Sequence, residues 1–309
     1  MDADILEFIV ESEYEDLRID KYLSVMMPDQ SRSYLQKLIK SEAVFLDLKP
    51  VKSNCKVSDG LRVDVHLPEP VSLDIQPENI PLDIIYEDDD VILINKPKDM
   101  VVHPSAGHEQ HTIVNAVLYH CQGNLSSING VMRPGIVHRI DKDTTGVIVI
   151  CKNDQAHNSL AEQLKEHSIT RKYHAIVYNN FTEDEGTVDA PIGRSPNDRK
   201  KMAVNYKNGR NAVTHYRVLK RFGKYTYIEC QLETGRTHQI RVHMSSIGHP
   251  LLGDTVYGPG KSPVNLQGQT LHAKVLGFIH PATGKYMEFD SPLPEYFQQL
   301  LDKMEKMQI

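Results

Sequence analysis

Four prolines between His66 and Asp83 constrain the fold of this chain more than any other feature, because proline interrupts helices and the interior of sheets. The stretch HLPEPVSLDIQPENIPLD also lacks a helical period, so we interpret it as an extended linker. A chain of 309 residues is long enough for two domains. We therefore predict an N-terminal module over residues 12–76 and a larger domain over residues 77–309.

The N-terminal module is predicted to hold two short helices followed by strands. Ile19, Tyr22 and Leu23 have helical spacing, and SRSYLQKLIK carries apolar residues at a similar spacing. The later segment VFLDLKPVKSNCKVSDGLRVDVHLP alternates apolar and polar residues around Asp59 and Gly60, as strands joined by tight turns do. The prediction is a small αα-β unit.

The larger domain mixes many strand-like runs with fewer helical ones. DIIYEDDDVILINKP predicts two strands around an acidic turn, and GVIVICKN, RKYHAIVYN, AVTHYRVLKRF and YTYIECQLE predict further strands. HTIVNAVLYHCQG and AHNSLAEQLKEHSI have the pattern of helices. Because strands outnumber the helices that regular βαβ crossovers need, we predict an α+β domain with a mixed, mostly antiparallel sheet.

Composition and charge argue against several classes of protein. No apolar run approaches the roughly 18 residues of a membrane span, and the acidic N-terminus is unlike a secretory signal. The 4 cysteines are too scattered for a CxxC metal site or a disulfide framework, which indicates a reducing compartment. We expect a cytoplasmic protein that does not act in a membrane. The net charge of -6 argues against indiscriminate coating of nucleic acid, so phosphate contacts must be local.

One stretch, RSPNDRKKMAVNYKNGR, concentrates basic side chains in a part of the chain that is poor in acids. It is either a solvated hairpin or a contact surface for RNA phosphates. The basic residues are Arg194, Arg199, Lys200, Lys201, Lys207 and Arg210. We take Arg199, Lys200 and Lys201 as candidate RNA-binding residues.

Two segments place dense polar side chains next to strands. In PGIVHRIDKDTTGVIVI, Asp141 precedes a predicted strand and follows Arg139, so it is either a nucleophile kept ionised by a cation or a turn residue that caps backbone amides. In LETGRTHQIRVHMSSIGHPLLGD, Gly235 permits a tight turn, and the Arg and His residues after it have a strand-like register. An ion pair between Arg236 and Asp141 would keep the carboxylate charged.

Other constellations lack the pattern that their chemistry requires. The histidines at 103, 108, 111 and 120 have no second cluster with ligand spacing, so we predict no metal site there. The three acids at 88–90 fall where a turn is expected, which favours a solvated turn over a cation site. His138 has no GxSxG motif to pair with, which argues against a hydrolase triad.

The polar segments resemble the RluA/RluD family of pseudouridine synthases. HRIDKDTTG is similar to the family's HRLDxxTSG signature, INKPKDMVVHP to its upstream NKPxGxxVHP motif, and TGRTHQIRVHM to its downstream GRTHQIRVH motif. The three occur in the family's order and spacing. RIDKYL with SRSYLQKLIK resembles the alpha-L RNA-binding module that many members carry at the N-terminus. The main departure is Asp99, which stands where NKPxG has glycine.

The resemblance implies roles for individual residues. Asp141 matches the family's catalytic aspartate, and Tyr173 in RKYHAIV matches the tyrosine that stacks on the target uracil and is proposed to take the proton from the carbon-linked product. Arg236 matches the arginine that pairs with the aspartate. Arg139 matches the arginine that enters the space left by the flipped nucleotide, and Ile240 an apolar position against the site.

The resemblance also implies the reaction and its partners. The expected function is the isomerisation of uridine to pseudouridine in structured RNA by base flipping, without a cofactor and usually by a monomer. Members with the N-terminal module commonly act on large-subunit ribosomal RNA, whereas other relatives modify transfer RNA. An RNA-binding ribosome-assembly factor with the same fold is the alternative, although such a binder would not need Asp141.

Overall fold

A computed structural model describes residues 5–27, 32–67, 75–105, 108–122, 124–126, 128, 133–198, 201–260 and 266–307. The chain divides into two compact units, Met1–Ser72 and Leu73–Ile309, and each is described by itself. The sequence had suggested a division between residues 76 and 77. Residues 68–74 of the proline-bearing stretch lie outside the described residues.

Unit 1 packs two helices against a small antiparallel sheet. Its strands are β1 (Ile5–Ile9), β2 (Val44–Leu46), β3 (Lys49–Pro50) and β4 (Arg62–His66), in the spatial order β1-β4-β2-β3. A 3-10 turn, η1 (Ser12–Tyr14), leads into the helices α1 (Ile19–Met26) and α2 (Arg32–Lys40). Tyr22, Leu23 and Leu38 from the helices are buried with Val63 from β4. The predicted αα-β arrangement is present, and β1 adds a strand before the predicted start at residue 12.

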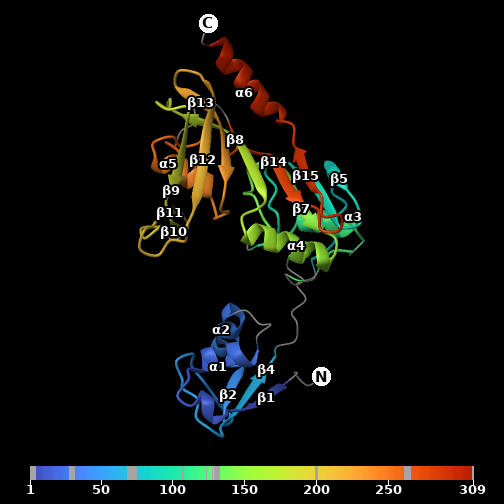
Figure 1. Cartoon of the computed structure of the whole chain (residues 1–309), viewed down its shortest axis with the longest axis vertical. Coiled ribbons are helices and arrows are strands. Elements are labelled where there is room, and N and C mark those ends of the chain that lie inside the picture. Colours follow the sequence, from blue (N-terminus) through green and yellow to red (C-terminus); the bar gives the residue numbers. More distant parts are fainter. Residues whose placement is uncertain are drawn as a thin grey trace. The chain divides into compact units, whose positions relative to one another are not determined.

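Unit 2 is built on one long mixed sheet. Its strand order is β5-β6-β7-β14-β8-β13-β12-β9, with β15 paired to β14 (Figure 1). Only the β7–β14 pair is parallel among the described ladders. The α+β fold with a mixed, mostly antiparallel sheet is therefore confirmed. The strands are β5 (Ile84–Glu87), β6 (Val91–Lys96), β7 (Thr145–Cys151), β8 (Thr170–Tyr178), β9 (Glu185–Asp189), β12 (Val213–Arg221), β13 (Tyr225–Leu232), β14 (Leu271–Ile279) and β15 (Tyr286–Asp290).

Helices and one separate hairpin complete unit 2. The helices are α3 (Ile113–His120), α4 (Asp154–Lys165), α5 (Gln239–Ser246) and α6 (Glu295–Lys306), and β10 (Ile192–Arg194) pairs with β11 (Met202–Val204). Helix α6, red in Figure 1, buries Phe297 and Leu301 against Ile176 of β8. No helix in the described part of the chain combines the length and apolar character needed to cross a bilayer.

The segment 239–246 forms a helix, so the strand predicted there is wrong. All residues from Gln239 to Met244 are buried, including the polar ones. A helix covered by protein on every side has no polar face, and its sequence therefore loses the helical period. The alternation of Ile240, Val242 and Met244 with polar residues gave a false strand signal.

Candidate active site

A pocket of about 490 Å³ in unit 2 brings together the polar segments singled out in the sequence. Its lining comes from the loop before β7, from β8, and from the turn that leads into α5. Asp141, Tyr173, Arg236, Arg139 and Ile240 all line it. This volume lies within the range of about 300–1,000 Å³ that is usual for ligand sites, so a flipped nucleoside is of suitable size.

The loop that carries Asp141 is fixed from behind by a buried lysine. Lys96, at the end of β6, donates from Nζ to the carbonyl oxygens of Pro97, Met100 and Lys142 at 2.7, 2.8 and 2.9 Å. Burial lowers the pKa of Lys96 to about 7, although the acids around it, led by Asp143, oppose this shift. The bond to Lys142 O ties the loop to the sheet one residue after Asp141.

Two further features fix this loop. Gly146 pairs with Ala273 in the parallel β7–β14 ladder, and a Cβ at Gly146 would lie 2.2 Å from the Ala273 oxygen, so the strands can approach only at glycine. Asp99 adopts φ +64, the left-handed conformation that glycine takes most readily. Its carboxylate lies 2.8 Å from Lys142 Nζ, a contact that glycine would not provide.

Arg241 holds the Asp141 carboxylate in place. Its Nη1 donates to Asp141 Oδ2 at 2.9 Å, while Nε and Nη2 donate to the two oxygens of Asp254 at 2.7 and 2.9 Å. Burial alone would lower the pKa of Arg241, but Asp254 and then Asp141 outweigh burial and raise it. Asp254 is itself fully buried and accepts the backbone N–H groups of Val256 and Tyr257. Arg241 is therefore a fixed cation beside Asp141.

The expected ion pair of Arg236 with Asp141 is wrong. Arg236 lines the pocket, but its Nε donates to the Asn211 carbonyl at 2.9 Å, and it forms no ion pair within the described residues. Because residues 239–246 are helical, Arg241 reaches Asp141 from the first turn of α5. Arg236 lies in the preceding turn, beside the segment that leads into β12.

The turn before α5 is held by the side chain of Gln239. Its Oε1 accepts from Thr234 Oγ1 at 2.8 Å and from the Arg236 N–H at 2.9 Å, and its Nε2 donates to the Val213 carbonyl at 2.9 Å. His238 completes the turn with φ +58, and its Nε2 lies 3.8 Å from Asp141 Oδ1. These hydrogen bonds from the buried Gln239 side chain fix the position of the turn.

Tyr173 lies on β8, between β14 and β13 in the sheet, with 8% of its surface exposed. Burial raises the pKa of its hydroxyl, and the charge of Asp141 adds to this, against an opposing effect of Arg171. The ring lines the same pocket as Asp141. Tyr173 therefore presents a neutral phenol from a rigid strand.

The other predicted residues fall into two groups. Arg139 is exposed at the pocket, and Ile240 is buried in its wall. Lys201 does not line the pocket: it precedes β11, and its Nζ lies 3.3 Å from the Val256 carbonyl. Arg199 and Lys200 lie outside the described residues.

Sequence reasoning missed Arg171, a further arginine that lines the pocket. Arg171 is 6% exposed, and its Nη2 donates to the Glu233 carbonyl at 2.8 Å, whereas its buried Nε has no partner among the described residues. It lies two residues before Tyr173 on the same strand, so both side chains point to the same face. That strand period was the available signal. His138, next to it, has its pKa lowered to about 3 by burial and by the charge of Arg171.

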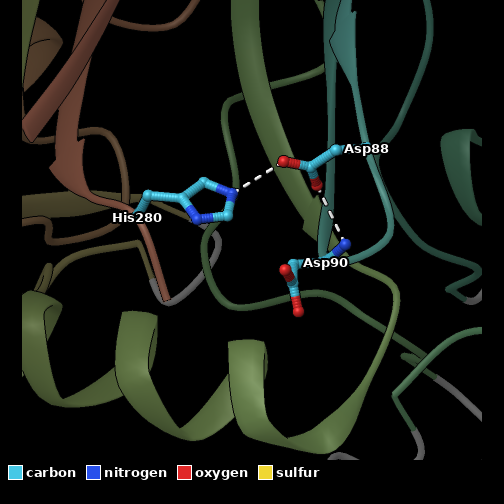
Figure 2. A group of neighbouring side chains, drawn as sticks. All are labelled: Asp88, Asp90 and His280. Atoms are coloured by element: carbon cyan, nitrogen blue, oxygen red, sulfur yellow. Dashed lines mark hydrogen bonds and ion pairs between the residues drawn. The ribbon is translucent and has the colours of Figure 1, made fainter. Parts of the chain in front are cut away.

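The acidic turn at 88–90 approaches a histidine from the turn after β14. Figure 2 shows Asp88, Asp90 and His280, whose possible ligand atoms lie within 4.8 Å of one another. Asp88 accepts from His280 Nε2 at 2.7 Å, from Tyr86 at 2.8 Å, and from the Asp90 and Val91 N–H groups, both at 2.9 Å. Through these bonds Asp88 links the turn before β6 to the turn after β14. The bonds account for its position without a bound cation.

Comparisons with known proteins agree on one family. The sequence model of RNA pseudouridylate synthase matches residues 90–246. The chain is 52% identical over 301 residues to an uncharacterized RNA pseudouridine synthase of Bacillus subtilis, covering 97% of this chain and 98% of that one. It is 48% identical to ribosomal large subunit pseudouridine synthase D of Zymomonas mobilis, covering 93% of each. The solved structure of human RNA pseudouridylate synthase domain containing 4 matches with a TM-score of 0.56 and 26% identity, covering 72% of this chain and 92% of that one.

Proposed function

The chain belongs to the RNA pseudouridylate synthase family and is an RNA-modifying isomerase, and we propose that it converts uridine to pseudouridine in large-subunit ribosomal RNA with Asp141 as the attacking group. The observation that carries the proposal is the ion pair of 2.9 Å between Asp141 and Arg241 at the wall of a pocket that Tyr173 also lines. Relatives named ribosomal large subunit pseudouridine synthase D, 43–48% identical, support this RNA target.

The pocket geometry supports a base-flipping mechanism. A uridine inside folded RNA hides its glycosidic bond, so the enzyme must extrude the nucleoside, at a cost of roughly a few kcal/mol. Tyr173 offers a rigid ring on which the uracil stacks, and Ile240 forms an apolar wall. Arg139, which is exposed at the pocket, fills the space that the nucleoside leaves in the RNA.

Asp141 then acts on the extruded nucleoside. Its carboxylate attacks the anomeric carbon or the uracil ring, or assists formation of a glycal-like intermediate; in each case the base detaches, turns and rejoins through C5. The Tyr173 hydroxyl takes the C5 proton and at the same time passes its own proton to the ring or to water, so that the phenol stays neutral. The reaction exchanges one bond for another within a nucleoside, so its chemistry consumes no redox equivalent, metal ion or nucleotide.

The remaining surfaces bind the RNA around the target. Lys201, Lys207 and Arg210 are on or next to the β10–β11 hairpin, and the Arg236 bond to Asn211 joins the end of this segment to the pocket wall. We assign phosphate contacts to Arg199, Lys200 and Lys201, and further RNA contacts to unit 1. A ribosomal substrate places the enzyme in the cytoplasm, where we propose that it acts as a monomer.

The test compares the wild type with Asp141→Asn and Asp141→Ala. A map of pseudouridine from carbodiimide-dependent reverse-transcription stops should lose a few ribosomal sites in cells carrying either variant. With purified protein, both variants should form no product and yet bind the RNA within a few-fold of wild-type affinity.

The control is Asp302→Asn, which removes one exposed carboxylate of α6 and should change neither readout. If only pseudouridines in transfer RNA were lost, the substrate would be transfer RNA and not ribosomal RNA. A wild-type enzyme that binds ribosomal RNA without forming product would instead favour an assembly factor.

A further inference from the structure

Arg171 is a buried cation in the active-site pocket that lacks an acidic partner among the described residues. With 6% of its surface exposed, it forms one hydrogen bond, from Nη2 to the Glu233 carbonyl at 2.8 Å. Its Nε is buried without a partner. Buried charges are ordinarily paired, because leaving water costs several kcal/mol. Because Arg171 lines the pocket without an acidic partner, a ligand there can supply an acceptor to the end of the guanidinium.

The surroundings of Arg171 keep this site open. A Cβ at Gly235 would lie 2.6 Å from Arg171 Nη1, so only glycine at this position leaves room for the guanidinium. Burial lowers the pKa of Arg171, but an arginine stays protonated in proteins. The neighbouring His138 accepts the Val149 N–H at Nε2 and stays neutral, so it adds no second positive charge beside the arginine.

The position of Arg171 relative to Tyr173 identifies the chemistry of that ligand. The two residues are two apart on β8, facing Leu276 and Ala273 of β14, and both line the pocket. A uracil that stacks on Tyr173 would share the pocket with Arg171, and its carbonyl oxygens are the acceptors that it offers to a guanidinium. On the basis of the proposed function, we infer that Arg171 is a catalytic residue that donates to a uracil carbonyl oxygen and stabilises the negative charge that develops on the detaching base.

The charge arises from the electron balance of the reaction. As the C1′–N1 bond breaks, its electron pair stays with the uracil, and the charge spreads over N1, O2 and O4. When C5 joins C1′, a pair from the ring forms the new bond and the C5 proton leaves to a base. Attack of Asp141 on the ring would also place charge on a carbonyl oxygen. Every route therefore gains from a fixed cation at this edge, and the gain is largest in the transition state.

The first test is substitution at Arg171 with rate and affinity measured separately. In single-turnover reactions at saturating enzyme, Arg171→Met should be about 100-fold slower or worse, the loss expected for one donor to a developing charge. Arg171→Lys should lose less, and the Kd for RNA should stay within about 3-fold for both. Arg217→Met is the control, because it removes an exposed arginine of β12 that pairs with Glu229.

Gly235→Ala separates the role of Arg171 from its contribution to folding. The added methyl displaces the end of a flexible side chain and keeps the charge in the protein, so the free energy of unfolding should change little. The rate should nevertheless fall at least about 10-fold. A wild-type rate in this variant would overturn the role even if Arg171→Met failed to fold.

A double-substitution cycle, which combines Arg171→Met with a change in the target uridine, then identifies the contact. RNA with 2-thiouridine or 4-thiouridine at the target weakens one hydrogen-bond acceptor. One of them should slow the wild type and have no further effect on Arg171→Met, since the contact is already absent. Equal sulfur effects in both enzymes, or a loss confined to RNA affinity, would overturn the inference. Product formation by Arg171→Met at the wild-type rate would do so too, while loss of product in Asp141→Asn would leave the proposed function intact.

Discussion

Arg241 lies 2.9 Å from Asp141 and holds the fully buried Asp254 with its other donors. The planar guanidinium matches two carboxylates at once, which a lysine cannot do. One side chain thus joins the loop that carries Asp141 to the buried Asp254. This arrangement couples the position of the Asp141 carboxylate to the stability of unit 2.

Arg241→Gln should therefore damage both activity and folding. It leaves Asp254 buried without its cation, which costs about 3–5 kcal/mol, and it releases the Asp141 carboxylate. The pseudouridine rate should fall by at least about 100-fold. Urea unfolding and single-turnover kinetics measure the two effects.

Arg236→Gln is the matched comparison. It removes an arginine from the same pocket and keeps the Asp141–Arg241 pair, so we expect less than about a 10-fold loss of rate and little change in the free energy of unfolding. A larger loss of rate for Arg236→Gln than for Arg241→Gln would mean that Arg236, and not Arg241, is the arginine that supports Asp141 in the reaction.

Tyr173→Phe should separate stacking from proton transfer. The ring stays in the pocket, so RNA affinity should hold within a few-fold, but without the hydroxyl the rate should fall about 100-fold or more. Tyr173→Leu should also lose about 1–3 kcal/mol of base stacking. Release of tritium from RNA labelled at C5 of uridine measures the proton step. A phenylalanine variant as fast as the wild type would limit Tyr173 to stacking.

Lys96 should make stability depend on pH. Burial lowers its pKa to about 7, against about 10.4 in an unfolded chain. Between these values the unfolded chain binds a proton that the folded chain does not, so this group raises stability as pH rises from about 7 to 10. Lys96→Met should reduce the slope of the free energy of unfolding against pH in this range, by up to about 1.4 kcal/mol per pH unit.

Urea unfolding at several pH values between 7 and 10 measures this slope, and Lys285→Met, at an exposed position, should keep it. Equal slopes for the wild type and Lys96→Met would mean that Lys96 stays protonated in the folded chain. At pH 7 and below the methionine variant should also be slower, because there the protonated Lys96 donates to the Lys142 carbonyl behind Asp141.

Much of unit 2 was predictable because its strands and helices keep their periods. β6, β7 and β13 alternate or run apolar as buried strands do, and the motif resemblance led to Asp141 and Tyr173, which line one pocket. The fold class followed from the excess of strands over helices.

The errors have two origins. α5 is enclosed by protein, so its sequence carries no helical period and suggested a strand, whereas the pairing of Arg236 with Asp141 came from the motif resemblance and is made by Arg241 instead. Asp254, the residue that fixes Arg241, is the last residue of the second polar segment, but nothing in the sequence between them signalled that the two side chains meet. Arg171 was different, since its spacing of two from Tyr173 on a predicted strand was sufficient to place it beside the uracil site.

The basic segment before β11 should govern the salt dependence of RNA binding. Each phosphate contact contributes about one to the slope of log K against log salt, so Arg199→Glu with Lys201→Glu should flatten the slope by one to two and weaken binding. Lys303→Glu with Lys306→Glu changes the net charge equally on α6, which Figure 1 shows away from this hairpin, and should leave the slope unchanged. Equal slopes for both pairs would show that net charge, and not a local clamp, attracts the RNA. Unit 1 or Arg139 would then have to supply the phosphate contacts that position the target over Asp141.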